Sequence, residues 1–444
     1  MRPELAGLQD SRQAPQDGSG RTLAAWLAYL EHLHSKSIDL GLERVRAVLE
    51  RMPEAPPVPV ITVGGTNGKG STTAFLEAIL HSAGYHTGCY TSPHLLRYNE
   101  RIRVDRKVAS DEAIIAAFEA VERARADTPL TYFEFGTLAA LHHFRARAVD
   151  VLILEVGLGG RLDAVNVIDA DCAVVTSVAL DHMEFLGPDR ESIAREKAGI
   201  FRAGRPAVFG EGDVPDSLRQ HAQALGAGLL VAGQDFRHQS NPSQWSFHGP
   251  RGSLHALPYP ALRGAYQLDN AACALMALSC LQAQLPVALQ HVRDGLVSVD
   301  LPARLQVLPG QPAVILDVAH NPHAASALAR SLARMSGYKR TLLVCGMLED
   351  KDIPGVTSLF ADFADAWYLT DLPPPRGASA ASIERHLPAC PRQPEIRCFD
   401  APGAALRAAL ADAAPEDRIV AFGSFLTVAS VMEALGRTGG AWES

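Results

Sequence analysis

The fold of this chain is decided by residues 58–71, VPVITVGGTNGKGS. The first six residues form a short apolar run rich in β-branched side chains, which predicts a buried strand. Four glycines follow within the next seven residues, and residues 72–83 then have the composition of a helix. A strand, a glycine-rich loop and a helix in direct succession are the context that a phosphate-binding loop requires.

The loop carries the three features that phosphate binding needs. Glycines let backbone N–H groups approach phosphate oxygens without a Cβ in the way. Lys69 supplies a positive charge, and the Ser71 hydroxyl can reach a magnesium ion. The loop departs from the usual G-x-x-x-x-G-K-[ST] pattern, because Gly70 stands between the lysine and the serine. The alternative is a tight strand-to-helix turn without a ligand, and the strand before the loop favours phosphate.

Apolar runs and helical patterns alternate on either side of this loop. Continuous apolar runs at residues 150–156 and 172–178 predict parallel strands buried on both faces. Helices are predicted at residues 23–49, with an interruption at 35–37, and at 135–147 and 190–201. This alternation predicts an α/β fold with a mostly parallel sheet.

A second unit of the same kind follows. Residues 234–257 are polar and rich in turn formers, which predicts a small β insertion, and helices are predicted at 267–285 and 287–297. Strand-like runs return at 313–316, 341–345, 366–369 and 418–422, each with a helix after it. We therefore expect a flexible polar leader at 1–20, a phosphate-loop ATPase domain at 21–298 and a smaller Rossmann-like α/β domain at 299–444.

Composition excludes several classes of protein. Of the 444 residues, 47% are hydrophobic and 20% charged, which is typical of a globular protein. A net charge of -8 argues against a nucleic-acid or membrane-surface partner. Residues 1–20 lack the apolar run of a secretory signal, and no apolar run reaches the roughly 18 residues of a membrane span. Seven cysteines without a C-x-x-C pair suit the reduced thiols of a cytoplasmic protein.

Three polar residues outside the loop invite a functional interpretation. Glu155 ends a strongly apolar strand, where open α/β sheets place their ligands, so a metal or a cationic partner is expected. His182 reads from the residues alone as a general base or a polar core residue. Lys197 follows Arg195-Glu196 in a predicted helix, where a lysine is usually a solvated charge.

Further motifs extend from the loop along nearly the whole chain. They are SPHL (92–95), YNER (98–101), EVGLGGRLDA (155–164), DH (181–182), GPDRESI (187–193), EKAGI (196–200), LDVAHNP (316–322) and FGSF (422–425). Together with the loop and its extra Gly70, these motifs resemble the Mur ligase superfamily. More narrowly, they resemble the folylpolyglutamate synthases, in the right order from about residue 30 to residue 431.

The resemblance implies an ATP-dependent amide ligase. In this family the γ-phosphoryl group of ATP passes to a substrate carboxylate, and the amine of L-glutamate attacks the resulting acyl phosphate. Two magnesium ions are implied, with Ser92, Glu155, His182 and Lys197 as ligands. Lys69, His182 and Lys197 are the implied catalytic residues, Lys197 as a carbamate formed with carbon dioxide. Carbamylation needs a neutral amine, so the site must lower the pKa of Lys197.

The resemblance also implies a nucleotide site that spans both domains. It assigns ATP to Asn67, Gly68, Lys69, Gly70, Ser71, Asn270, Arg304, Asp317 and His320. Asp317 ends an apolar strand, and His320 opens the next helix, whose N–H groups can face phosphate. Without the resemblance, Arg304 reads equally well as a surface arginine in a linker.

The N-terminal segment narrows the expected substrate. Residues 31–45 resemble the proteobacterial bifunctional enzymes of the family. The dihydropteroate pocket that this implies consists of Ser37, Ile38, Asp39, Thr131, Tyr132, Phe133, Glu134, Leu162, Asp163 and Ala164. Aspartates and aromatic residues in such loops are more often turn and packing residues. We expect a monomer that adds L-glutamate to dihydropteroate, giving dihydrofolate, and to reduced folates.

Two other functions stay open at this point. One is a monofunctional folylpolyglutamate synthase, and the other is a nucleotide-switched binding protein that uses the same loop. The sequence departs from the family pattern at two positions, the first of which bears on substrate preference and the second on a polar contact in the C-terminal domain. Val165 stands where many relatives have threonine, and Leu426 where many have histidine.

Overall fold

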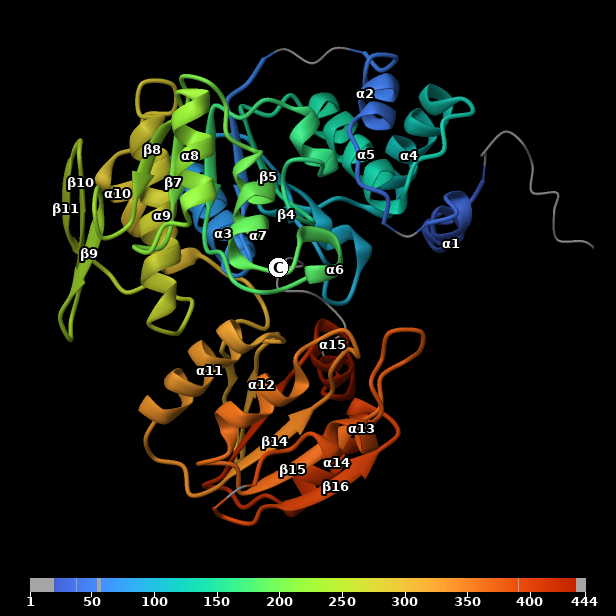
Figure 1. The fold of residues 1–444 in the computed structure, drawn as a ribbon, viewed down its shortest axis with the longest axis vertical. Coiled ribbons are helices and arrows are strands. Elements are labelled where there is room, and N and C mark those ends of the chain that lie inside the picture. The colour runs from blue at the N-terminus through green and yellow to red at the C-terminus, as the bar shows by residue number, and fades with distance from the viewer. Residues whose placement is uncertain (1–19, 37, 54–56, 390, 437–444) are drawn as a thin grey trace, which may run out of the picture.

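The computed structural model describes residues 20–36, 38–53, 57–389 and 391–436, so the leader expected at 1–20 lies outside the described residues apart from Gly20. Figure 1 shows two halves joined by a short connection, the first built around a large sheet and the second around a smaller one. The chain leaves the first half after α10 (Leu289–Ser298) and enters the second with β12 (Gln306–Leu308).

The first half contains a mixed sheet of eight strands. The five strands β2, β5, β1, β6 and β7 run parallel with β8, whereas β3 and β4 form an antiparallel edge. Their order is β4 (Lys107–Val108), β3 (Ile102–Val104), β2 (Thr87–Tyr90), β5 (Val151–Glu155), β1 (Val60–Gly64), β6 (Cys172–Val175), β7 (Pro206–Phe209) and β8 (Gly228–Val231).

Helices cover both faces of this sheet. Ile61 and Val63 of β1 pack with α3 and α9 on one face, whereas Val60 belongs to the core beneath α1, α4 and α5 on the other. The remaining elements of this half are α1 (Leu23–Leu33), α2 (Glu43–Leu49), α3 (Lys69–Ser82), η1 (Tyr98–Arg101), α4 (Asp111–Arg125), α5 (Tyr132–Ala146), η2 (Ala164–Val167), α6 (Met183–Leu186), α7 (Arg190–Ala198), α8 (Asp216–Leu225) and α9 (Tyr266–Cys280).

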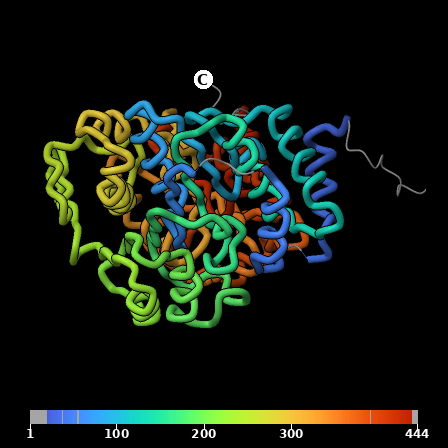
Figure 2. Tube along the Cα trace, turned by 90° about the horizontal axis from the view of Figure 1, so that it is seen from above, coloured from blue at the N-terminus to red at the C-terminus, as the bar shows by residue number. Residues whose placement is uncertain are grey.

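The predicted β insertion is confirmed as a three-stranded antiparallel sheet. It consists of β9 (Arg237–Ser240), β10 (Trp245–Gly249) and β11 (Gly252–Leu257). Figures 1 and 2 place this sheet at one end of the first half and α1 at the other, so neither lies between the two large sheets.

The second half is a six-stranded sheet with one antiparallel edge. Its order is β12, β13 (Ala313–Leu316), β17 (Arg418–Phe422), β14 (Thr341–Cys345), β15 (Ala366–Thr370) and β16 (Glu395–Phe399). All neighbours except β12 and β13 are parallel. The helices are α11 (Pro322–Arg334), α12 (Ile353–Thr357), η3 (Ser358–Phe360), α13 (Ala380–Arg385), α14 (Pro402–Asp412) and α15 (Phe425–Ala434).

The predicted α/β class is confirmed, with small differences at the element boundaries. The first predicted helix is two helices, α1 and α2, separated by residues 34–42. Helix α3 begins at Lys69 rather than at residue 72, because Gly68 adopts a left-handed φ of 86° and turns the chain directly into the helix. In the described part of the chain, no helix is both long and apolar enough to cross a bilayer.

Candidate active site

The phosphate loop lies between β1 and α3, and its glycines are sterically required. A Cβ on Gly65, whose φ is 141°, would overlap the Thr176 hydroxyl, and a Cβ on Gly68 would overlap the amide oxygen of Asn270. Asn270 therefore contacts the loop directly, as expected for a residue of the same site. The backbone N–H of Asn67 donates to the Ser177 hydroxyl (2.9 Å), which anchors the other side of the loop.

Lys69 and Gly70 begin α3 at a point where residues of the two halves lie close together. The Lys69 Nζ donates to the carbonyl oxygens of Gly65 (3.0 Å) and Thr66 (3.2 Å), so its ammonium group folds over the loop. A Cβ on Gly70 would point between Arg304 Nη2 (3.6 Å) and Glu155 Oε1 (3.9 Å). The first turn of α3, which is the positive end of the helix, thus lies beside an arginine of the second half and a buried carboxylate, and this combination suits a phosphate with its metal ion.

Glu155 is a buried carboxylate and not a surface glutamate. Glu155 pairs with Val63 of β1 in the sheet, beside the start of the loop, and only 4% of its surface is exposed. Oε2 accepts the backbone N–H of Ser92 (3.2 Å). Burial raises the pKa of Glu155, and the nearby Lys69 opposes that rise. A further cation would stabilise the charged form of this buried carboxylate. The Ser92 hydroxyl belongs to the same residue as the N–H that bonds Glu155.

Lys197 is also buried, contrary to the usual behaviour of a lysine in a charged helical run. It lies on α7 with 4% of its surface exposed. Burial, together with the positive charge of Lys69, lowers its pKa to about 7. The amine therefore has a substantial neutral fraction near neutral pH, which is the form that reacts with carbon dioxide.

His182 immediately precedes α6 in a left-handed conformation with φ 51°. Burial lowers its pKa to about 4, so the imidazole is neutral and able to act as a ligand. Within the described ranges no group of three or more His, Cys, Asp or Glu side chains is arranged to hold a metal. The donors present are too few for a metal cage made by protein alone. They fit magnesium ions that take most of their oxygens from ATP phosphates and water.

Arg304 lies in an unusual turn of the second half, and its side chain reaches the first turn of α3. Its neighbours Ala303 and Leu305 both have left-handed φ values, 58° and 45°, and both are buried. Asp317 holds the turn: Oδ2 accepts the N–H of Leu305 (2.8 Å), and Oδ1 accepts the N–H of Ala319 (2.8 Å). Burial raises the pKa of Asp317, and Arg304 opposes that rise. Asp317 thus lies beside the turn that carries Arg304, and each of its carboxylate oxygens already accepts a backbone N–H.

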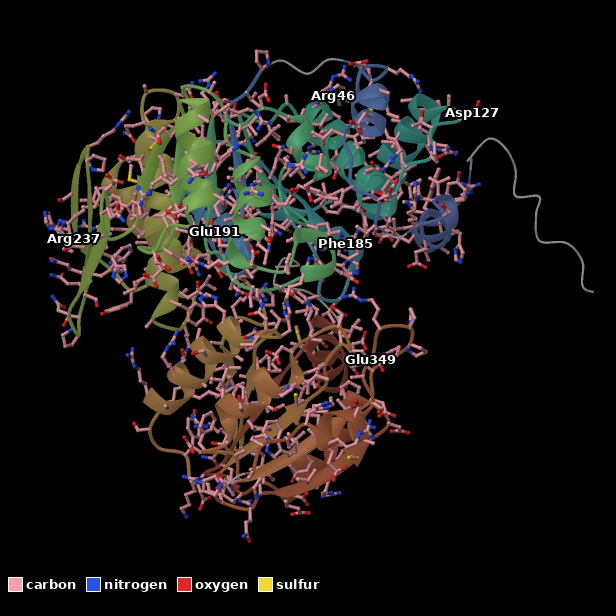
Figure 3. All side chains as sticks on the ribbon, in the orientation of Figure 1. Arg46, Asp127, Phe185, Glu191, Arg237 and Glu349 are labelled. Atoms are coloured by element: carbon pink, nitrogen blue, oxygen red, sulfur yellow. The ribbon has the colours of Figure 1, made fainter. Side chains whose placement is uncertain are left out.

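A polar junction that sequence reasoning missed joins the two halves beside His182. Asp181 Oδ1 accepts from Lys351 Nζ (2.7 Å), and Asp181 Oδ2 accepts from Asn321 Nδ2 (3.1 Å). His320 Nε2 lies 3.6 Å from the same Oδ2, and Asn321 also bonds Asn67 of the phosphate loop (3.1 Å). Although burial opposes it, His320 and Lys351 hold the pKa of Asp181 well below its usual range. Figure 3 labels Phe185 and Glu349 on the facing edges of the two halves near this junction.

The residues assigned to dihydropteroate form a second cluster at the start of α5. Thr131 caps that helix, and the Glu134 carboxylate accepts the Thr131 N–H (2.7 Å). Arg44 joins this cap to Asp39, since it donates to Glu134 (3.1 Å) and to Asp39 Oδ2 (2.7 Å). Arg44 was not singled out from the sequence, because an arginine in a charged helix gives no signal of its partners. Ile38 is half-buried beside Asp39, and Ser37 lies outside the described residues.

The other assigned residues meet this cluster through Gly157. The Phe133 ring packs against Gly157 so closely that a Cβ there would lie 2.6 Å from Cζ, and Tyr132 is stacked edge-on to Tyr98. Asp163 accepts the N–H groups of Leu158 (2.8 Å) and Val165 (3.1 Å), and burial raises its pKa to about 7. Leu162 is half-buried, and Ala164 is buried. The segments 131–134 and 162–164 therefore lie side by side, as a shared pocket requires.

Comparison with known proteins agrees with this geometry. The family model "Mur ligase middle domain" matches residues 63–278, and "Mur ligase, glutamate ligase domain" matches residues 303–425. The chain is 48% identical over 432 residues to the dihydrofolate synthase/folylpolyglutamate synthase of Escherichia coli K12, covering 97% of this chain and 99% of that protein. It is 34% identical to the folylpolyglutamate synthase of Lacticaseibacillus casei, covering 84% and 89% of the two chains.

Solved structures show the same likeness in three dimensions. E. coli FolC in complex with DHPP and ADP superposes with a TM-score of 0.88 at 48% identity, covering 94% of this chain and 98% of that one. A bifunctional folylpolyglutamate synthase/dihydrofolate synthase with Mn, AMPPNP and L-glutamate bound gives 0.87 at 47% identity, with 96% and 100% covered. The chain belongs to the Mur ligases and, within them, to the family of ATP-dependent dihydrofolate synthases/folylpolyglutamate synthases.

Proposed function

We propose that this protein adds L-glutamate to dihydropteroate, forming dihydrofolate, and to reduced folates, forming polyglutamates. One observation carries the proposal: the first turn of α3 lies beside both Glu155 and Arg304. Two relatives support the ligands, because one was solved with DHPP and ADP and another with Mn, AMPPNP and L-glutamate. The bifunctional relatives cover nearly the whole chain, including the Asp39–Arg44 segment.

The site residues would mainly neutralise the charge of the phosphates and hold the reactants in position. A substrate carboxylate oxygen attacks the γ-phosphorus of ATP, ADP leaves, and an acyl phosphate forms. The glutamate amine then attacks the acyl carbon, inorganic phosphate leaves, and the amine loses a proton. Lys69, from the first half, and Arg304, from the second, would both neutralise phosphate charge and so help to hold the reactants in position. Asn67, Gly68, Gly70, Ser71, Asn270, Asp317 and His320 are proposed as the other nucleotide contacts.

The metal ligands are proposed on the same grounds. Ser92 and Glu155 would hold one magnesium ion beside the phosphate loop, where the carboxylate is buried. His182 and a carbamylated Lys197 would hold the second, and the lowered lysine pKa supports the modification. The ions supply positive charge to the phosphates and the substrate carboxylate. A carbamate would replace a repelling ammonium with an attracting oxygen ligand.

The proposed division of labour follows the two halves of the chain. Residues 21–298 would bind the phosphates and the pteroate, in the pocket of Ile38, Asp39, residues 131–134 and residues 162–164, to which we add Ser37. Residues 299–444 would close the nucleotide site and complete the ligase. We propose that the protein acts as a monomer.

Product analysis tests the proposal. The purified protein is incubated with ATP, magnesium and L-glutamate, with either dihydropteroate or tetrahydrofolate as the acceptor. The bifunctional proposal requires a glutamylated product and ADP from both acceptors, and no ADP above background when glutamate is omitted. Product from tetrahydrofolate alone would leave a monofunctional folylpolyglutamate synthase, the activity named for the L. casei relative. ADP release independent of glutamate would instead indicate a nucleotide-driven switch.

A further inference from the structure

A buried ion pair behind the nucleotide site has no role in the chemistry described so far. Glu77 lies on α3, the helix of the phosphate loop, and Arg103 lies on β3. Their side chains are 1% and 3% exposed. The guanidinium binds the carboxylate in a forked arrangement, with Nε 3.0 Å and Nη2 2.9 Å from Oε2.

The remaining donors of Arg103 hold the loop that carries Ser92. Nη1 donates to the Thr91 hydroxyl (3.1 Å) and to the Glu100 carbonyl oxygen (3.0 Å). Thr91 directly precedes Ser92, and Glu100 lies at the far end of the same loop. Both ends of the segment 91–100 are therefore attached to one planar, rigid group, which is itself bound to α3.

The interior of the loop is ordered by the Glu100 side chain. Its carboxylate accepts three consecutive backbone N–H groups, those of Leu95 (2.7 Å), Leu96 (2.8 Å) and Arg97 (2.7 Å). At the other end of the loop, the Ser92 N–H bonds Glu155 (3.2 Å). A continuous series of bonds thus connects the helix of the phosphate loop to the two residues proposed to hold the first metal ion.

We propose that Glu77 and Arg103 are positioning residues for this metal site. They keep the Ser92 loop at a set distance from α3, so that the Ser92 hydroxyl and the Glu155 carboxylate stay aligned with the phosphates. This proposal rests on the metal assignment of the proposed function. Packing alone does not require the pair, because apolar residues of similar volume commonly replace a buried ion pair without loss of stability. What an apolar pair cannot supply is the two Nη1 bonds to the loop.

Thr91→Val is the least disruptive test, because it removes a single hydroxyl, which accepts from Arg103 Nη1 and donates to the Glu100 carbonyl oxygen (3.4 Å). Thr87→Val is its matched control: Thr87 begins β2, the strand that ends directly before Thr91, it is buried, and its hydroxyl has no hydrogen-bond partner among the described residues. Binding of Mn²⁺ is measured by electron paramagnetic resonance with AMPPNP present and no folate, alongside thermal unfolding. Outer-shell partners of metal ligands change affinity by about 10- to 100-fold when removed, so we expect Thr91→Val to weaken Mn²⁺ binding by about 10-fold. Thr87→Val should leave it unchanged.

Two further variants separate positioning from packing. Arg103→Lys keeps a cation beside Glu77 but lacks the fork that reaches Thr91 and Glu100, and Glu77→Leu with Arg103→Met keeps only the volume. Both should weaken Mn²⁺ binding by at least about 10-fold and speed hydrogen exchange of the Leu95–Arg97 amides, with the thermal midpoint of the double variant near that of the wild type.

Equal Mn²⁺ affinity in the Thr91→Val and Thr87→Val proteins would overturn the proposal, whether or not the Arg103 variants fold. The assay uses neither dihydropteroate nor glutamate. A wild-type protein that binds Mn²⁺ and AMPPNP but makes no product would therefore contradict the proposed function and leave the positioning role standing.

Discussion

At the residue scale, Lys69 is the most direct test of the nucleotide site. Its ammonium group bonds two loop carbonyl oxygens, and these bonds can be exchanged for phosphate oxygens. Lys69→Ala should lower kcat by roughly a thousandfold, as the loss of a preorganised electrostatic contact does. ADP release measures the effect, and circular dichroism checks the fold. Lys107→Ala, at an exposed lysine of β4, is the control. Near-normal turnover in a folded Lys69→Ala protein would refute the assignment.

Lys197 provides a second test, based on its buried amine. The folded-state pKa is lowered to about 7, so the ammonium form dominates below that pH and cannot react with carbon dioxide. With ¹³C-bicarbonate we expect a carbamate carbon signal at pH 8 that disappears as the pH falls below about 7, and that is absent from Lys197→Arg. The same shift predicts that stability rises with pH between about 7 and 10.5, since only the unfolded amine holds its proton there. An unlabelled, unmodified lysine in active enzyme would rule out the carbamate.

These two lysines also show what a sequence can and cannot predict. Lys69 was identifiable because its glycines and strand are adjacent in the chain. The burial of Lys197 was not, because it depends on how α7 packs against segments that are distant in sequence. A Cβ on Gly160, for example, would lie 3.0 Å from the Lys197 carbonyl oxygen near the end of this helix. Only the resemblance to known ligases pointed to Lys197. Arg44 and the Glu77–Arg103 pair were missed for the same reason, since their partners are remote in sequence.

At the element scale, the start of α3 depends on the left-handed conformation of Gly68. Gly84, just after the same helix, has a similar φ of 90° but nothing within 4 Å of its Cβ position. Alanine at either glycine should cost roughly 1–2 kcal/mol of stability through backbone strain. Gly68→Ala also meets Asn270, so the loop must shift. Losing one hydrogen bond to a charged group costs roughly 1.5–3 kcal/mol, about ten- to hundredfold in affinity. Calorimetry with AMPPNP should show that loss for Gly68→Ala only; equal affinities would contradict it.

Elements were predictable where burial was continuous. The apolar runs of β1, β5, β6, β13, β14, β15 and β17 are central strands, and each was expected close to its observed bounds. Strand β16, EIRCF, is mostly exposed at the edge of the second sheet, so its residues carry no apolar run and it was not identified. The short edge strands β4 and β12 were missed for the same physical reason. The short strands β2, β3 and β7 are largely buried inside the first sheet, and they were missed as well.

At the scale of the whole molecule, the residues proposed for the active site come from both halves. The phosphate loop and Glu155 come from the first half, whereas Arg304 and Asp317 come from the second. The sequence indicated two domains, and only the resemblance to known ligases implied that they share a nucleotide site. Lys351 lies in a run of charged residues, which is typical of a surface turn. Its side chain is nevertheless only 5% exposed and forms an ion pair with Asp181 of the first half.

This contact leads to a prediction about closure. Replacing Lys351 with methionine leaves the Asp181 carboxylate partly buried without its cation, which is unfavourable for the closed arrangement. A protein that is closed for only a fraction of the time binds its ligand more weakly by that fraction. We therefore expect Lys351→Met to have a larger radius of gyration in small-angle scattering and an affinity for AMPPNP reduced by about tenfold. Lys339→Met is the control, because its pair with Glu416 is exposed and lies within the second half. If scattering and affinity match the control, the ion pair does not govern closure, and the contacts of Asn321 with Asp181 and Asn67 must hold the halves together instead.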